Sequence, residues 1–139
     1  MKLFLRLALA ASLAVSAFSH AYLYVHGYQH IPMIGTSFLI QASVSFSLAI
    51  LVAAGGPWWV EWSAAGLAGG SLVAFVLSRT VGLFGFTEHG WDPAPHAALT
   101  VVAEALCVLL RAATVVLSLR SRRNVGGRVL AAEATTAAA

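Results

Sequence analysis

The sequence predicts an all-α polytopic membrane protein, a four-helix transmembrane bundle with short links. Of its 139 residues, 60% are hydrophobic and only 9% are charged, and the mean hydropathy is +0.86. A soluble domain is about 45–50% apolar and about 25% charged. A chain this short has too few charges to cover so much apolar surface in water, and a lipid bilayer removes that conflict.

Four apolar runs are long enough to cross a bilayer, which takes about 20 residues of helix. The spans are expected at residues 3–24, 34–54, 62–81 and 97–119. The links between them are short, so each helix must run antiparallel to the one before it. Residues 1–119 therefore form the transmembrane domain. The tail of residues 120–139 is basic and then rich in Ala and Thr, and we expect it to be disordered.

The first span has a second interpretation. Met1–Ala21 resembles a signal peptide, with basic Lys2, an apolar middle and Ser19-His20-Ala21 as a cleavage site. Cleavage would leave three spans and a new amino terminus outside. The apolar stretch continues through Tyr24, which favours a full span, and both interpretations stay open at this point.

Lysine and arginine gather at the two ends of the chain. Lys2 and Arg6 open the first span, and the last span is followed by four arginines: Arg120, Arg122, Arg123 and Arg128. The positive-inside rule then places both termini in the cytoplasm and predicts a multi-pass protein of the inner (plasma) membrane. This distribution is typical of membrane topology signals. It argues against a nucleic-acid partner despite the net charge of +3.

Ionisable side chains inside the spans predict an intramembrane polar layer, because each costs about 2.5–3.5 kcal/mol unless it faces a partner or a cavity. Glu104 and Arg111 are seven residues apart and share a helical face. Glu61 and Arg79 share a face of the third span in the same way. Antiparallel packing then predicts that Arg79 pairs with Glu104 and that the deeper Arg111 leans toward Glu61.

Two further polar residues lie at the depth of Glu104, namely His20 in the first span and Gln41 in the second. All four helices would thus contribute to the layer. It has two interpretations: ion pairs and hydrogen bonds that fix the helix register, or a polar cavity open to the outside. Gly66, Gly69 and Gly70 form a small-xxx-small pattern on the third span, which permits a close helix contact within or between chains.

All five histidines fall at the outer side of this topology, close to Glu88 and Asp92. Imidazole and carboxylate are ligands for zinc and copper. One hypothesis is therefore a loose outer copper or zinc site made of His26, His30, His89 and His96, completed by Glu88 or Asp92. A haem held by His20 and His96 is the lesser alternative. The spacing matches no known metal motif, and interfacial histidines also arise without a ligand role.

No catalytic arrangement stands out, so an enzyme is the less favoured class. The single cysteine, Cys107, lies in an apolar run and is expected to be a small buried hydrophobe. We expect a non-catalytic accessory or structural subunit of a membrane complex, with other subunits or itself as partners, or a small-molecule binder at the outer face. The alternatives are a transporter-like protein that uses the polar layer and an outer-face copper or zinc binder.

Two stretches carry a resemblance. The first joins His20–Tyr24 to Tyr28 and Ile31–Gly35, and the second runs from Arg79 to Trp91. Together they resemble a family of small four-span bacterial integral membrane proteins to which no activity is assigned. The resemblance covers most of the chain before the tail and implies the four-span architecture alone.

Overall fold

The computed structural model describes residues 2–137, with side chains for residues 3–124. Its elements are α1 (Lys2–Val25), the short 3-10 helix η1 (Tyr28–His30), α2 (Ile34–Ala53), α3 (Trp58–Arg79) and α4 (His96–Ala137). Within this range there is no strand, only one isolated bridge between Leu83 and Phe86. Four of the helices are long and apolar enough to span a membrane, so the predicted fold class is confirmed.

The helices end where glycine and proline interrupt the apolar runs. Gly55, two residues after the end of α2, has a φ of +84°, and Pro57 precedes the first residue of α3 with a φ of −64°. Gly82, with a φ of +87°, lies just beyond α3. Positive φ is readily available only to glycine. Gly55 therefore helps to reverse the chain in the short α2–α3 link, and Gly82 does so at the start of the longer α3–α4 link.

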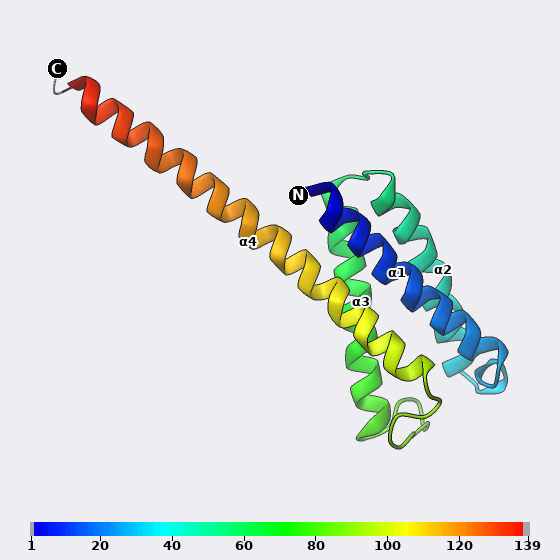
Figure 1. The fold of residues 1–139 in the computed structure, drawn as a ribbon. Coiled ribbons are helices and arrows are strands. Elements are labelled where there is room, and N and C mark those ends of the chain that lie inside the picture. The colour runs from blue at the N-terminus through cyan, green and yellow to red at the C-terminus, as the bar shows by residue number, and fades with distance from the viewer. Residues whose placement is uncertain (1, 138–139) are drawn as a thin grey trace.

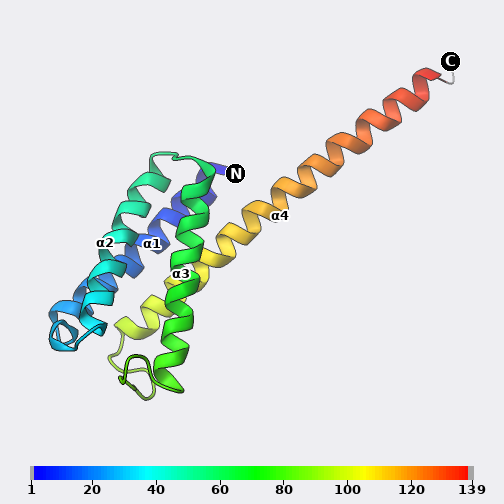
Figure 2. The same cartoon turned by 180° about the vertical axis from the view of Figure 1, so that it is seen from behind.

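The four helices alternate in direction, and α4 leaves the bundle (Figures 1 and 2). One end of the bundle carries η1 and the long α3–α4 link. We call it the outer end, following the Lys/Arg distribution. The inner end carries the amino terminus and the α2–α3 link. From its start at the outer end, α4 crosses α1 and α3 and then diverges from both (Figures 1 and 2).

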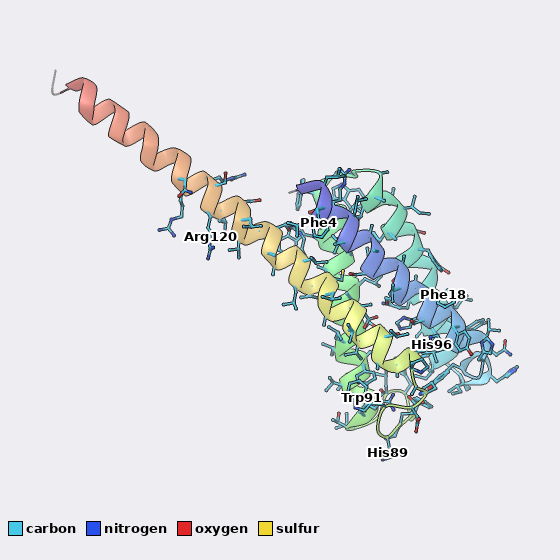
Figure 3. All side chains as sticks on the ribbon, in the orientation of Figure 1. Phe4, Phe18, His89, Trp91, His96 and Arg120 are labelled. Atoms are coloured by element: carbon cyan, nitrogen blue, oxygen red, sulfur yellow. The ribbon has the colours of Figure 1, made fainter. Side chains whose placement is uncertain are left out.

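The apolar core lies in the middle and inner half of the bundle. Its buried members come from all four helices and include Leu13, Val52, Val60 and Cys107, so the expectation for Cys107 is confirmed. Large apolar side chains also face outward: Phe4 is 74% exposed, and Phe18 points away from the bundle with it (Figure 3). An apolar exterior around an apolar core suits a lipid environment.

The tail continues the last helix. In the structure α4 is one helix of 42 residues that includes residues 120–137. Alanine and arginine make up eight of the 18 residues of this stretch, and both have high helix propensity.

Candidate functional site

The centre of the polar layer is Glu104 of α4. Its side chain is 1% exposed, and its Oε1 accepts hydrogen bonds from the Ser16 hydroxyl at 2.9 Å and the Gln41 amide at 3.3 Å. His20 Nδ1 lies 3.9 Å from the same oxygen. Side chains of α1, α2 and α4 therefore converge on one carboxylate oxygen, as expected for His20, Gln41 and Glu104.

The orientation of His20 follows from its place on α1. Ser16 lies four residues earlier and so faces the same side of the helix. His20 Nδ1 is 3.0 Å from the Ser16 carbonyl oxygen, which can only accept, so Nδ1 carries a proton and donates it there. The ring meets Phe38 edge-on, with 5.2 Å between centroids. This proton is therefore hydrogen-bonded to the backbone of α1.

Arg79 does not pair with Glu104, and that prediction is wrong. Its guanidinium lies 3.1 Å from a carboxylate oxygen of Glu88 and donates to the Asp92 carbonyl oxygen at 2.8 Å. It also lies over the Phe75 ring, 4.8 Å from the centroid. The cause is the α3–α4 link, which folds back over the end of α3 and brings its own acid to Arg79. Helix periodicity carries no information about such a link.

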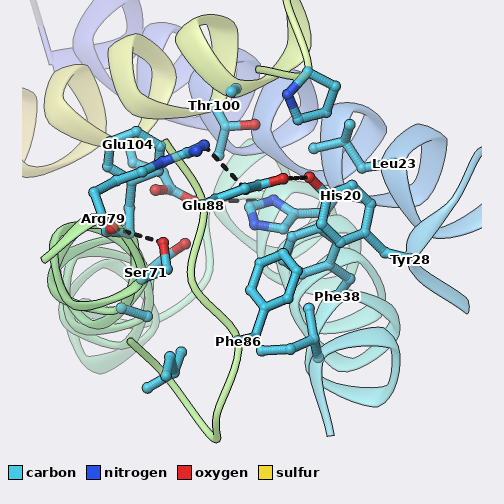
Figure 4. Close-up of a pocket in the computed structure, with 17 residues that line it drawn as sticks. His20, Leu23, Tyr28, Phe38, Ser71, Arg79, Phe86, Glu88, Thr100 and Glu104 are labelled. Carbon is cyan, nitrogen blue, oxygen red and sulfur yellow. Dashed lines mark hydrogen bonds and ion pairs between the residues drawn. The ribbon is translucent and has the colours of Figure 1, made fainter. Parts of the chain in front are cut away.

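Glu88 also joins the two outer links. It accepts a hydrogen bond from the Tyr28 hydroxyl of η1, so Arg79, Glu88 and Tyr28 form a continuous polar chain, drawn with dashed lines in Figure 4. Burial and the hydrogen bond to Glu88 raise the pKa of Tyr28 well above its ordinary value. The phenol therefore stays protonated and keeps donating.

A cavity of about 90 Å³ lies between this polar chain and Glu104. Thr100 and His20 line it together with Glu104, and aromatic rings close much of the rest (Figure 4). Thr100 Oγ1 on its wall has no hydrogen-bond partner among the residues described, and Glu104 Oε2 has none there besides the nearby Ser71 hydroxyl of α3. Buried polar atoms are normally paired, so these two are available to a ligand.

The deeper pair lies apart from this cavity. Arg111 Nε is 3.8 Å from a carboxylate oxygen of Glu61, as expected for these two residues. Its guanidinium also stacks over the Trp62 ring, 4.3 Å from the centroid, and donates to the Thr114 hydroxyl at 2.9 Å. The predicted layer is thus two sites: one around Glu104 in the outer half and one around Arg111 at the inner end.

The outer histidines do not converge. His26 and His96 each stack on Tyr22, with both pairs of centroids 3.9 Å apart. Two nearly parallel rings this close to a third must occupy its opposite faces. The Tyr22 ring therefore separates the imidazoles, and they cannot bind one ion together.

The remaining members of the proposed metal site do not gather at one point in the described part of the chain. His30 contacts Gln29, His89 lies in the α3–α4 link (Figure 3), and Glu88 binds Tyr28 and Arg79. Over the part of the chain that is described, no three His, Cys, Asp or Glu side chains are grouped so that they could hold a metal ion. The sequence predicts that these residues lie on the same side of the membrane, but it does not predict the directions in which their side chains point.

Sequence reasoning missed two members of the site. Ser16 could have been found, because it lies one helical turn before His20. Tyr28 entered the sequence analysis only as part of the family resemblance, and its partner Glu88 is 60 residues away with no periodic relation to it. Scans against protein-family models, curated proteins and solved structures find no match for this chain, so its function must be inferred from the chemistry of the cavity.

Proposed function

We propose that this chain is a membrane protein that binds a small organic cation in the outer cavity. The observation that carries the proposal is the Glu104 carboxylate. It is buried, its Oε1 accepts hydrogen bonds from Ser16 and Gln41, and its Oε2 borders the cavity with only the Ser71 hydroxyl nearby among the described side chains. A ligand that brings a positive charge and N–H donors satisfies that oxygen.

The charges around the cavity favour a cation. Arg79 and Glu88 form an ion pair with each other, which leaves the Glu104 carboxylate as the uncompensated group. His20 does not replace the ligand, because its Nδ1 proton is donated to the Ser16 carbonyl. Phe38, Phe75 and Phe86 line the same space, and aromatic faces attract cations.

The cavity suits a small ligand. Its volume is about 90 Å³, and we choose ethylammonium, which has three non-hydrogen atoms. This small amine is therefore a suitable probe: it combines three N–H donors with a short apolar chain.

The test is thermal unfolding of the purified protein in detergent with ethylammonium chloride, ethanol or potassium chloride. Ethylammonium is expected to raise the unfolding temperature saturably, since a ligand at 100 times its Kd stabilises by about 2.7 kcal/mol. Glu104→Gln should abolish the effect, and the matched control Glu61→Gln should retain it. Equal shifts with ethanol or potassium chloride, or an unchanged shift in Glu104→Gln, would contradict the proposal.

A second variant keeps the test decisive if Glu104→Gln does not fold. Thr100→Val keeps the shape of the side chain and removes the unpaired hydroxyl from the cavity wall. It is expected to weaken ethylammonium binding about five-fold, equivalent to one hydrogen bond of ~1 kcal/mol, with the carboxylate left in place. Unchanged affinity would place the probe outside this cavity.

Transport is the second candidate, and it requires the polar layer to connect both sides. The packing favours binding instead, because Leu13, Val52 and Cys107 form a buried apolar cluster on the inner side of Glu104. Uptake of ethylammonium into proteoliposomes would establish transport. The accessory-subunit alternative predicts that the chain co-purifies from native membranes with a larger complex, whereas a binder can be isolated alone.

A further inference from the structure

At the inner end of the bundle, a groove of about 940 Å³ opens where α4 diverges from α1 and α3. The divergence is visible from both sides of the molecule (Figures 1 and 2). The groove is separate from the outer cavity and shares no lining residue with it. Nothing in the proposed function uses it.

The groove is strongly basic. Three arginines, Arg6, Arg111 and Arg122, line it against one acid, Glu61. Arg111 is already engaged with Glu61. Arg6 and Arg122 have no acidic partner among the side chains that the structure describes.

Arg6 in particular is held at the groove without a partner for its charge. Its Nε is buried and has no hydrogen-bond partner in the described part of the chain. Its guanidinium rests against the α2–α3 link, so closely that a Cβ at Gly55 would lie 2.7 Å from Nη1. Two arginines, one from α1 and one from α4, thus border the same groove with unpaired charge.

The wall of the groove also has an apolar part. Leu9 and Leu117 lie deeper than Arg6 and Arg122 on the same two helices, beside Thr114 and Ser118, and Trp58, which is 71% exposed, lines the groove on α3. Tryptophan favours the level of the lipid head groups. Arginines at the inner end with leucines deeper in the groove match the two parts of a phospholipid, a phosphate and an acyl chain.

We propose that this groove binds one anionic phospholipid. The phosphate lies between Arg6 and Arg122, whose guanidinium groups can each form two parallel hydrogen bonds to phosphate oxygens, and an acyl chain lies along the leucines. The net positive charge of the lining selects an anionic lipid over a zwitterionic one. Basic pockets between membrane helices at the cytoplasmic side bind anionic head groups in this way.

The test is native mass spectrometry of the full chain in detergent. Phosphatidylglycerol is titrated against phosphatidylcholine with the same acyl chains. The double variant Arg6→Gln/Arg122→Gln is compared with Arg120→Gln/Arg123→Gln, which removes the same charge from exposed positions outside the groove lining. Each lost groove arginine should weaken phosphatidylglycerol about five-fold, corresponding to ~1 kcal/mol per basic residue, whereas the control pair should change it less than two-fold.

Several results would overturn the proposal. Equal affinities for the two lipids would show that the groove does not select an anionic head group. Equal losses of affinity in both double variants would show that the arginines act only through general electrostatic attraction. Inorganic phosphate that binds as tightly as the lipid would make this an anion site without acyl recognition. Retained affinity in Arg6→Gln/Arg122→Gln would place the lipid elsewhere. Unfolding temperatures of the lipid-free variants establish that each one is folded.

Discussion

At the scale of single residues, Glu88 and Glu104 have different roles although both border the outer cavity. Glu88 is bound by a tyrosine and an arginine and closes the cavity by joining the two outer links. Glu104 receives hydrogen bonds on one oxygen and leaves the other to the cavity. The first acid is therefore expected to affect mainly stability, and the second mainly binding.

Tyr28→Phe tests the structural role of the first acid. It removes the hydroxyl that donates to Glu88 and is expected to destabilise the protein by about 1.5–3 kcal/mol, the range for a hydrogen bond to a charged group. Thermal unfolding in detergent at pH 8 measures this loss. Tyr24→Phe is the control, because it removes a tyrosine hydroxyl of the same outer region that takes no part in the polar chain.

Tyr28 is also expected to make the stability of the protein depend on pH. Because burial and Glu88 raise the folded-state pKa of Tyr28, its contribution is fully present below the ordinary tyrosine value of about 10. Above that value the unfolded chain releases the proton before the folded chain does, so stability falls as the pH rises. The drop between pH 8 and pH 11 should be smaller in Tyr28→Phe than in the parent. An identical loss of stability in the variant and the parent would mean that Tyr28 does not cause the pH dependence.

At the scale of elements, the sequence predicts most of what depends on helical period and little of what depends on links. The four spans were predictable because apolar runs end at Gly55 and Pro57 or at the turn after Arg79. The convergence of His20, Gln41 and Glu104 was predictable because depth in a membrane follows from residue count. The Arg79–Glu88 pair was not, since no period describes the path of the α3–α4 link.

The glycines also show which features the sequence predicts and which it does not. Gly66 and Gly70 were noted for close helix contact, yet a Cβ at either position would meet nothing within 4 Å in the structure. Gly35, which was noted only as the end of a stretch in the family resemblance, is the close-packed glycine among those of the described helices. A Cβ there would lie 2.5 Å from the Tyr28 carbonyl oxygen and 3.0 Å from that of Gln29.

Gly35→Ala is therefore expected to destabilise the protein by about 1–3 kcal/mol, the usual cost of overpacking. The backbone of η1 must shift to admit the methyl group, and Tyr28 shifts with it. Gly66→Ala is the control: it has free space and gains up to ~1 kcal/mol of helix propensity. Unfolding temperatures of the two variants compare them directly, and a Gly35→Ala protein as stable as the parent would contradict this packing.

At the scale of the whole molecule, four antiparallel helices bring η1 and the α3–α4 link to one end and the amino terminus to the other (Figure 1). The signal-peptide interpretation bears on the same architecture. Residues 3–21 supply Leu13 to the core and Ser16 to Glu104, so cleavage at Ala21 would remove both. Retention of α1 and the orientation of the bundle in the membrane remain predictions.

The orientation can be measured by cysteine labelling in a Cys107→Ala background. His89→Cys reports on the α3–α4 link, and Arg123→Cys reports on the far part of α4. A membrane-impermeant maleimide is expected to label His89→Cys in intact cells and Arg123→Cys only after the cells are permeabilised, in accord with the positive-inside rule. The reverse pattern would invert the molecule and move the outer cavity to the cytoplasmic side.

The hydrogen bonds to Glu104 also constrain how the protein is assembled during synthesis. Its donors lie 88 and 63 residues earlier in the chain, so α1 and α2 enter the membrane well before the acid that they bind. Until α4 is inserted, Ser16 and Gln41 must find temporary partners in water, in the insertion machinery or in each other. The last helix to be made thus completes the polar layer, and a ribosome that stalls before α4 would leave an incomplete bundle for quality control to recognise.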